Sequence, residues 1–174
     1  MPIPINRTRS KAKAGMRKSG NKSFRPEQKL VHDILKECAI GITELQMEYK
    51  PKSIVPLKGT DLTGIRSPTL DIYFKFEDTE VAIRLNGPYH DELKQERKDN
   101  IQQLFLENQP IPWQVFNFKY WDMQYVFKRN KRKLTKSELI QAYNEIKRSF
   151  IMTKIKLKIP TDEILNKLAI LHCN

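Results

Sequence analysis

Two acids, an arginine, an asparagine and a histidine occur at spacings that could bring them to one end of a small sheet. Arg84 and Asn86 lie two residues apart in a strand-like segment and so share a face, and Asp71 belongs to the preceding strand-like segment. His90 follows a Gly-Pro turn, and Asp99 comes nine residues later. A carboxylate at a sheet end can hold a hard divalent cation, which stabilises phosphate charge and lowers the pKa of a bound water. Histidine can transfer the proton, so the set indicates metal-assisted phosphodiester hydrolysis.

Each of these residues alone says little, because a single Asp or His is more often an ordinary surface residue. Their positions depend on a predicted β-hairpin. Residues 69–76 are β-branched and aromatic, residues 77–79 are typical of a tight turn, and residues 80–86 form the second strand. The two faces of that second strand carry Val81, Ile83 and Leu85 on one side, and Ala82, Arg84 and Asn86 on the other.

The other elements predict an α/β domain with a small central mixed sheet flanked by helices. Pro26 and Glu27 suit the first turn of a helix, because Pro is tolerated there and an acid complements the helix dipole. The pattern predicts four helices besides the hairpin, at 25–39, 91–108, 136–150 and 161–171. It predicts a strand at 113–118 and a strand-like segment at 154–159. Residues 41–67 are predicted to be mostly loop with one short strand. The expected buried helix residues are Leu30, Val31, Ile34 and Leu35, then Leu93, Ile101, Leu104 and Phe105, and then Leu139, Ile140, Tyr143 and Ile146.

The composition favours a polyanionic partner. The chain has 174 residues with 32 Lys and Arg against 20 Asp and Glu, a net charge of +12. The only cysteines are Cys38 and Cys173, which excludes a disulfide framework and a thiolate-rich structural zinc site. No apolar run approaches the length of a membrane span, and the start lacks a secretory signal. We therefore expect a soluble intracellular protein, in the cytoplasm or nucleoid, without a membrane partner.

The positive charge is concentrated in two segments. Residues 1–25 contain eight cationic side chains and no acid, and residues 128–133 form a second basic run. The first segment predicts a flexible arm over residues 1–24 that orders on phosphates. A solubilising tail or an organellar presequence is the alternative for the arm, and a solvated loop is the alternative for the second run. The predicted phosphate-binding residues are Arg7, Arg9, Lys11, Lys13, Arg17, Lys18, Lys128, Arg129, Lys131, Arg132 and Lys133, together with Arg84.

Several short motifs, in this order and spacing, resemble the very-short-patch repair endonucleases. That group belongs to the PD-(D/E)XK nuclease superfamily, and some homing endonucleases are similar to it. The resemblance covers roughly Arg9 to Phe118. The motifs are Arg9-Ser10, Met16-Arg17, Arg25-Pro26-Glu27, Leu70-Asp71-Ile72-Tyr73-Phe74, the segment Val81 to His90, Lys98-Asp99 with Leu106, and Trp113-Gln114-Val115-Phe116.

The resemblance implies a restriction-endonuclease-like fold and a Mg²⁺- or Mn²⁺-dependent endonuclease acting on double-stranded DNA. Asp71 matches the metal-binding aspartate, and the backbone carbonyl of Leu85 would be the second metal contact. Glu27 matches the acid on the first helix, which organises the water around the metal. His90 matches the proton-transfer histidine, and Asp99 matches the aspartate that orients it. The implied nuclease domain spans residues 25–150, followed by a C-terminal extension over 151–174.

The chain also departs from the pattern. Arg84 and Asn86 stand where the wider superfamily carries its second acidic ligand. Asn86 can coordinate a metal or donate a hydrogen bond, but it cannot transfer a proton. Arg84 could bind a phosphate, although it would repel a nearby cation. The cysteine-rich zinc site of the family has no counterpart, so no structural zinc is expected.

Two other functions stay open from the sequence. One is a catalytically inactive nuclease-fold module that binds DNA or RNA. The segment Ile83 to His90 and the pair Tyr120-Trp121 also resemble the RAP domain of organellar RNA-processing proteins, although the helical repeats that usually precede that domain are missing. The other is a basic structural protein of a ribonucleoprotein assembly. The recognition sequence and the oligomeric state cannot be read from the chain.

Overall fold

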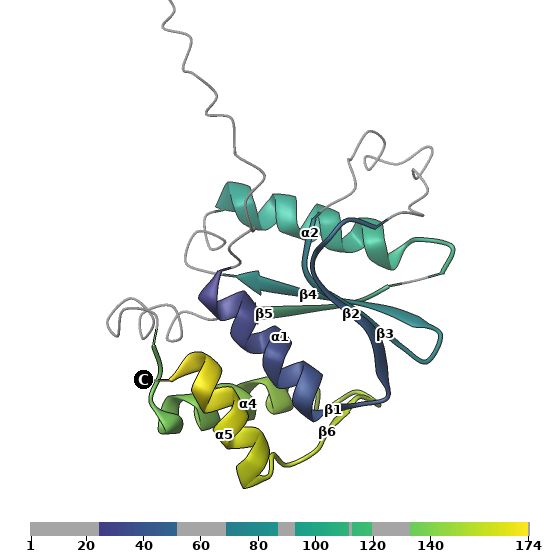
Figure 1. Ribbon diagram of the computed structural model, residues 1–174. Coiled ribbons are helices and arrows are strands. Elements are labelled where there is room, and N and C mark those ends of the chain that lie inside the picture. Colours follow the sequence, from purple (N-terminus) through teal and green to yellow (C-terminus); the bar gives the residue numbers. More distant parts are fainter. Residues whose placement is uncertain (1–24, 52–68, 87–92, 112, 120–132, 174) are drawn as a thin grey trace, which may run out of the picture.

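The computed structural model is an α/β structure in which helices cover both faces of a mixed four-stranded sheet (Figure 1). It describes residues 25–51, 69–86, 93–111, 113–119 and 133–173. Helix α2 lies on one face of the sheet, and helices α1, α4 and α5 lie on the other (Figure 1). This arrangement confirms the predicted mixed sheet flanked by helices. In the described part of the chain, every helix is too short or too polar to cross a membrane.

The sheet has the strand order β2-β3-β4-β5. Strands β3 (Leu70–Phe76) and β4 (Thr79–Asn86) form the predicted antiparallel hairpin, joined at Glu77 and Asp78. Strand β5 (Gln114–Lys119) pairs parallel to β4, with Ile83 opposite Phe116. Helix α2 (Leu93–Glu107) forms the crossover between these two strands, as a parallel pair requires. The parallel pair is what gives the sheet its mixed character.

Strand β2 (Ile42–Tyr49) is longer than expected, because this region was predicted to be mostly loop. It is an edge strand that pairs antiparallel with β3, and its register shifts between Thr43 and Gln46. Glu44 and Glu48 have positive φ values of 56° and 49°, so the strand is irregular at both glutamates. Such irregularities hide the two-residue period on which strand prediction depends. Pairing with the buried strand β3, rather than local propensity, determines this strand.

Helix α1 (Pro26–Cys38) buries the predicted stripe Leu30, Val31, Ile34 and Leu35 against the sheet. The same core takes Val81, Ile83 and Leu85 from β4, whereas Ala82 belongs to the cluster on the α2 face. The predicted division of β4 into two faces is therefore confirmed. Both faces are covered, which explains why Val81, Ala82 and Ile83 are apolar in succession.

The C-terminal residues belong to the same core as α1. Strand β6 (Lys156–Leu157) pairs with β1 (Ala39–Ile40), and α5 (Asp162–His172) packs beside α1. Helix α4 (Lys136–Ser149) begins with a capping box between Thr135 and Glu138. Its C-cap residue Phe150 is buried and packs edge-on against Phe116, with 4.8 Å between ring centroids. These contacts bring the last forty residues of the described chain onto the α1 face of the sheet.

Three helix residues that were expected to be buried are exposed instead. Ile140 in α4 is 44% exposed, and Ala142 fills the buried position. In α2, Ile101 and Leu104 are 40% and 50% exposed, while Phe105 and Leu106 are buried. The cluster that α2 covers contains few residues, so only a narrow stripe of this helix reaches it. The side chain of Leu93 lies outside the described residues.

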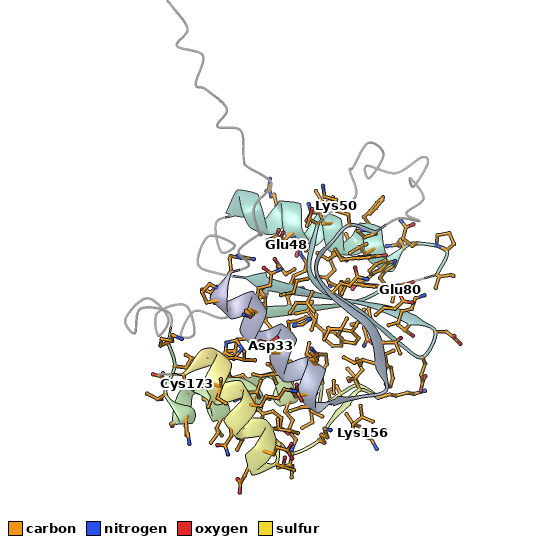
Figure 2. The ribbon with its side chains drawn as sticks, viewed as in Figure 1. Asp33, Glu48, Lys50, Glu80, Lys156 and Cys173 are labelled. Carbon is orange, nitrogen blue, oxygen red and sulfur yellow. The ribbon has the colours of Figure 1, made fainter. Side chains whose placement is uncertain are left out.

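A partly buried carboxylate on α1 bonds the C-terminal helix to the core. Asp33 accepts a hydrogen bond from His172 of α5 at 2.8 Å and one from the neighbouring His32 at 2.9 Å. Figure 2 shows Asp33 on the side of α1 that faces α5. Burial alone would raise the pKa of Asp33, but the hydrogen bonds from His172 and His32 outweigh it and hold the pKa well below 3.8.

We expect Asp33→Asn to lower the free energy of unfolding at pH 7 by about 2 kcal/mol. Because the folded-state pKa is depressed, the unfolded chain binds the proton first as the pH falls. The stabilisation is therefore present above pH 4 and declines below it, and wild type and variant should converge there. Urea denaturation between pH 3 and pH 7 measures this difference. A difference that is independent of pH would contradict the role of the ionised carboxylate.

Candidate functional site

The candidate site begins where the ladder between β3 and β4 ends. The last paired residues are Ile72 and Ile83, and the same register would next bring Asp71 opposite Arg84 and then Leu70 opposite Leu85. Instead, the N–H of Leu85 donates to Oδ2 of Asp71 at 2.8 Å. Leu70 packs with Ala82 and Leu106 on the α2 face, whereas Ile72 packs on the α1 face, so β3 changes face at Asp71. The Asp71 carboxylate therefore replaces a backbone carbonyl as the partner of β4.

The first turn of α1 holds the same aspartate. The guanidinium of Arg25 donates to Oδ1 of Asp71 at 2.7 Å, and the side-chain amide of Gln28 donates to the Asp71 backbone carbonyl at 2.6 Å. In Figure 1 the start of α1 lies beside the end of β4, which agrees with these contacts. Arg25 and Gln28 were not predicted as site residues. Arg25 was counted with the basic arm, and only the packing of α1 on the sheet brings it to Asp71.

Two side chains in the first turn of α1 that carry oxygen atoms are buried. Glu27 is 8% exposed and Gln28 is 1% exposed. Within the described part of the chain, Oε1 of Gln28 has no hydrogen-bond partner, although its amide nitrogen donates to Asp71. An unpaired buried oxygen is costly, and such atoms commonly bind a water or an ion. The start of α1 thus adds one buried oxygen acceptor, Oε1 of Gln28, on the residue whose amide contacts Asp71.

The other predicted polar pair lies under α2. Arg84 donates to Oδ1 of Asp99 at 2.9 Å, to the Asp99 carbonyl at 3.0 Å and to Gln102 at 2.7 Å. Both members of the ion pair are buried, with side-chain exposures of 12% and 10%. The guanidinium therefore joins β4 to α2. This arrangement was not expected, because Arg84 was considered as a phosphate contact and Asp99 as the partner of His90.

The two networks meet in consecutive residues of β4. Arg84 is bonded to α2 on one face, and the backbone N–H of Leu85 is bonded to Asp71. An extended residue directs its N–H and its carbonyl towards the same neighbouring strand. The Leu85 carbonyl therefore also faces the side on which Asp71 lies, as a shared metal contact would require.

The remaining predicted site residues fall mainly outside the described structure. His90, the arm residues 1–24 and the run 128–132 are not described, and neither is the side chain of Asn86. Lys133 is described and exposed just before α4. Among the described residues, no three His, Cys, Asp or Glu side chains gather closely enough to hold a metal by themselves. The roles predicted for these residues stay predictions.

Comparison with known proteins adds no assignment. No protein-family model, curated protein or solved structure matches this chain. The site therefore has to be interpreted from its own geometry and charge.

We expect Arg84→Met to lower the free energy of unfolding by about 3 kcal/mol, because it removes the guanidinium partner of the buried Asp99 carboxylate. Arg97→Met is the matched control, since Arg97 is an exposed arginine of the same helix as Asp99, and it should change stability by less than about 0.5 kcal/mol. Denaturant titration measures both. An Arg84→Met variant with normal stability but weakened DNA binding would show that Arg84 contacts phosphate instead.

Proposed function

We propose that this protein is a metal-dependent endonuclease that hydrolyses phosphodiester bonds in double-stranded DNA, with a PD-(D/E)XK-like fold. The observation that carries the proposal is the position of Asp71. It lies where two strands of a mixed sheet separate, next to a backbone group of the second strand and to the first turn of a helix. The helix–sheet–helix order around a β-hairpin, a crossover helix and a parallel strand also fits that fold.

The donors around Asp71 suit Mg²⁺ or Mn²⁺. Mg²⁺ is typically held by one or two carboxylates, with the remaining ligands supplied by waters and substrate phosphates. Asp71 offers a carboxylate whose side chain is 26% exposed, and the carbonyl of Leu85 faces the same side. Gln28 adds a buried oxygen without a donor among the described residues. These hard oxygen ligands fit a magnesium-type ion and exclude thiolate-dependent metal binding here.

The residues of the chain then take separate roles. When bound, the metal supplies charge stabilisation at the phosphate and an acidified water. Asp71 and the Leu85 carbonyl would hold it, and the buried Glu27 would accept hydrogen bonds from the surrounding water. His90 would transfer the proton. Arg84 and Asp99 fix β4 against α2, which holds Leu85 in place beside Asp71.

The charge of the chain supports a nucleic-acid substrate. The net charge of +12 arises largely from residues 1–25 and 128–133. Lysine and arginine side chains in such segments neutralise phosphates and release counterions, which gives affinity without sequence preference. A DNA duplex is therefore the proposed partner, with the arm and the basic run as its main non-specific contacts.

One observation favours the alternative, an inactive nuclease-fold module that binds DNA or RNA. Both carboxylate oxygens of Asp71 already have partners, Arg25 and the N–H of Leu85. In addition, Arg84 fills an expected acidic position and is bonded to Asp99. A module of this kind would bind nucleic acid through the same basic segments without cleaving it.

We expect Asp71→Asn to reduce the rate of plasmid nicking by at least about 100-fold, because an amide is a far weaker metal ligand than a carboxylate. Asp78→Asn is the matched control, since Asp78 is an exposed aspartate in the turn of the same hairpin, and its rate should equal that of wild type. The measurement is conversion of supercoiled plasmid in Mg²⁺, Mn²⁺ or chelator. His90→Ala should also reduce the rate.

Several outcomes of this assay would contradict the proposal. Equal nicking rates for wild type and Asp71→Asn would show that Asp71 takes no part in the cleavage reaction. Nicking that persists in chelator would exclude a metal-dependent step. DNA binding by wild type without any cleavage in Mg²⁺ or Mn²⁺ would favour the inactive module.

A further inference from the structure

The two carboxylate oxygens of Asp71 accept hydrogen bonds from two different kinds of donor, one from the backbone and one from an exposed side chain. Oδ2 accepts from the backbone N–H of Leu85, which belongs to β4 and cannot move without disturbing the strand. Oδ1 accepts from the guanidinium of Arg25, whose side chain is 50% exposed. Arg25 is the N-cap residue of α1, and its side chain makes no capping hydrogen bond, so the first turn of the helix does not depend on where the guanidinium lies. Oδ1 is therefore the oxygen whose partner can be replaced by a ligand, while Oδ2 keeps its bond to the strand.

The guanidinium lies where a cation would have to bind. It is 2.7 Å from Oδ1, within the distance range of a direct ion pair. A divalent ion coordinated by the same oxygen would be repelled by the positive charge and would have to displace it. The free protein should therefore have a low affinity for divalent metal at Asp71, although the oxygen donors suit it.

A DNA phosphate is a competing partner for the same guanidinium. Arginine binds phosphate oxygens through paired, charge-assisted hydrogen bonds, and its geometry matches phosphate as well as carboxylate. A half-exposed ion pair such as Arg25–Asp71 is weak. A phosphate placed beside it can therefore replace the Asp71 carboxylate as the partner of the guanidinium. The transfer would leave Oδ1 free and would bring the negative phosphate next to it.

We propose that Arg25 is a phosphate-binding residue of this site, and that it covers Asp71 until nucleic acid arrives. The inference rests on the proposed nuclease function. DNA binding then prepares the metal site, and the free protein holds little metal at Asp71. Because binding free energies are coupled reciprocally, metal must strengthen DNA binding by the same factor by which DNA strengthens metal binding.

The first experiment measures Mn²⁺ binding to the DNA-free protein by the loss of the free-ion electron paramagnetic resonance signal. Arg25→Gln should bind Mn²⁺ up to about fivefold more tightly than wild type, because the competing charge is gone. Arg25→Lys keeps the charge and should bind as weakly as wild type. Lys29→Gln is the matched control, since it removes an exposed cation one turn further along α1, and it should also match wild type.

The second experiment measures the affinity of the same variants for a short labelled duplex by fluorescence anisotropy, with and without Mg²⁺ at constant ionic strength. Mg²⁺ should strengthen DNA binding by wild type and by Lys29→Gln more than by Arg25→Gln. Without Mg²⁺, Arg25→Gln should bind the duplex more weakly than Lys29→Gln, because only Arg25 is placed to contact the phosphate at the site. Circular dichroism melting verifies that each variant is folded.

The failure of this inference can be distinguished from the failure of the proposed function. Equal Mn²⁺ affinity in wild type and Arg25→Gln, lost in both when Asp71→Asn is added, would show a metal site that Arg25 does not cover. A gain in Mn²⁺ affinity in Lys29→Gln equal to that in Arg25→Gln would show an effect of net charge alone. If no variant binds Mn²⁺ and Mg²⁺ leaves every duplex affinity unchanged, both the inference and the metal-dependent nuclease are wrong.

Discussion

The hydrogen bond between the N–H of Leu85 and the carboxylate of Asp71 is the contact around which the candidate site is arranged. The β3–β4 ladder stops at Ile72 and Ile83, and an unpaired backbone N–H beyond that point would be costly. The aspartate meets this need and stays attached to β4. It also leaves its second oxygen directed at the start of α1, where Arg25 and Gln28 reach the same residue.

Strand β4 is constrained from both of its faces. The apolar residues Ile83 and Leu85 pack under α1, while Arg84 crosses to the other face and bonds to Asp99 of α2. A buried ion pair of this kind contributes little net stability, but removing one partner is expensive, so it fixes the geometry strongly. The position of α2 relative to Asp71 is thus set by consecutive residues of one strand. Under the proposed function, a metal site with few protein ligands depends on such a rigid support.

Two carboxylates of the site each form an ion pair with an arginine. Arg25 pairs with Asp71, and Arg84 pairs with Asp99. The two pairs differ in exposure: the Arg84 pair is buried under α2, and Arg25 is half exposed. The exposure of Arg25 therefore lets an external anion compete for it, whereas Arg84 is not accessible in this way. Under the proposed function, this difference separates the residue that contacts substrate from the one that holds the fold.

The sequence by itself determined the hairpin, its two faces and the apolar stripe of α1, because these depend on periodicity within one segment. It also indicated Asp71 and Arg84 as polar residues of interest at a sheet end. It indicated only a short strand somewhere in 41–67 and not the full β2, whose irregular positions at Glu44 and Glu48 conceal its period. It also did not indicate the exposure of Ile101 and Leu104. Only the tertiary structure decided which charges meet. The pairs Arg25–Asp71 and Arg84–Asp99 join residues 46 and 15 positions apart, and such partners depend on how helices pack on the sheet, which no local pattern records.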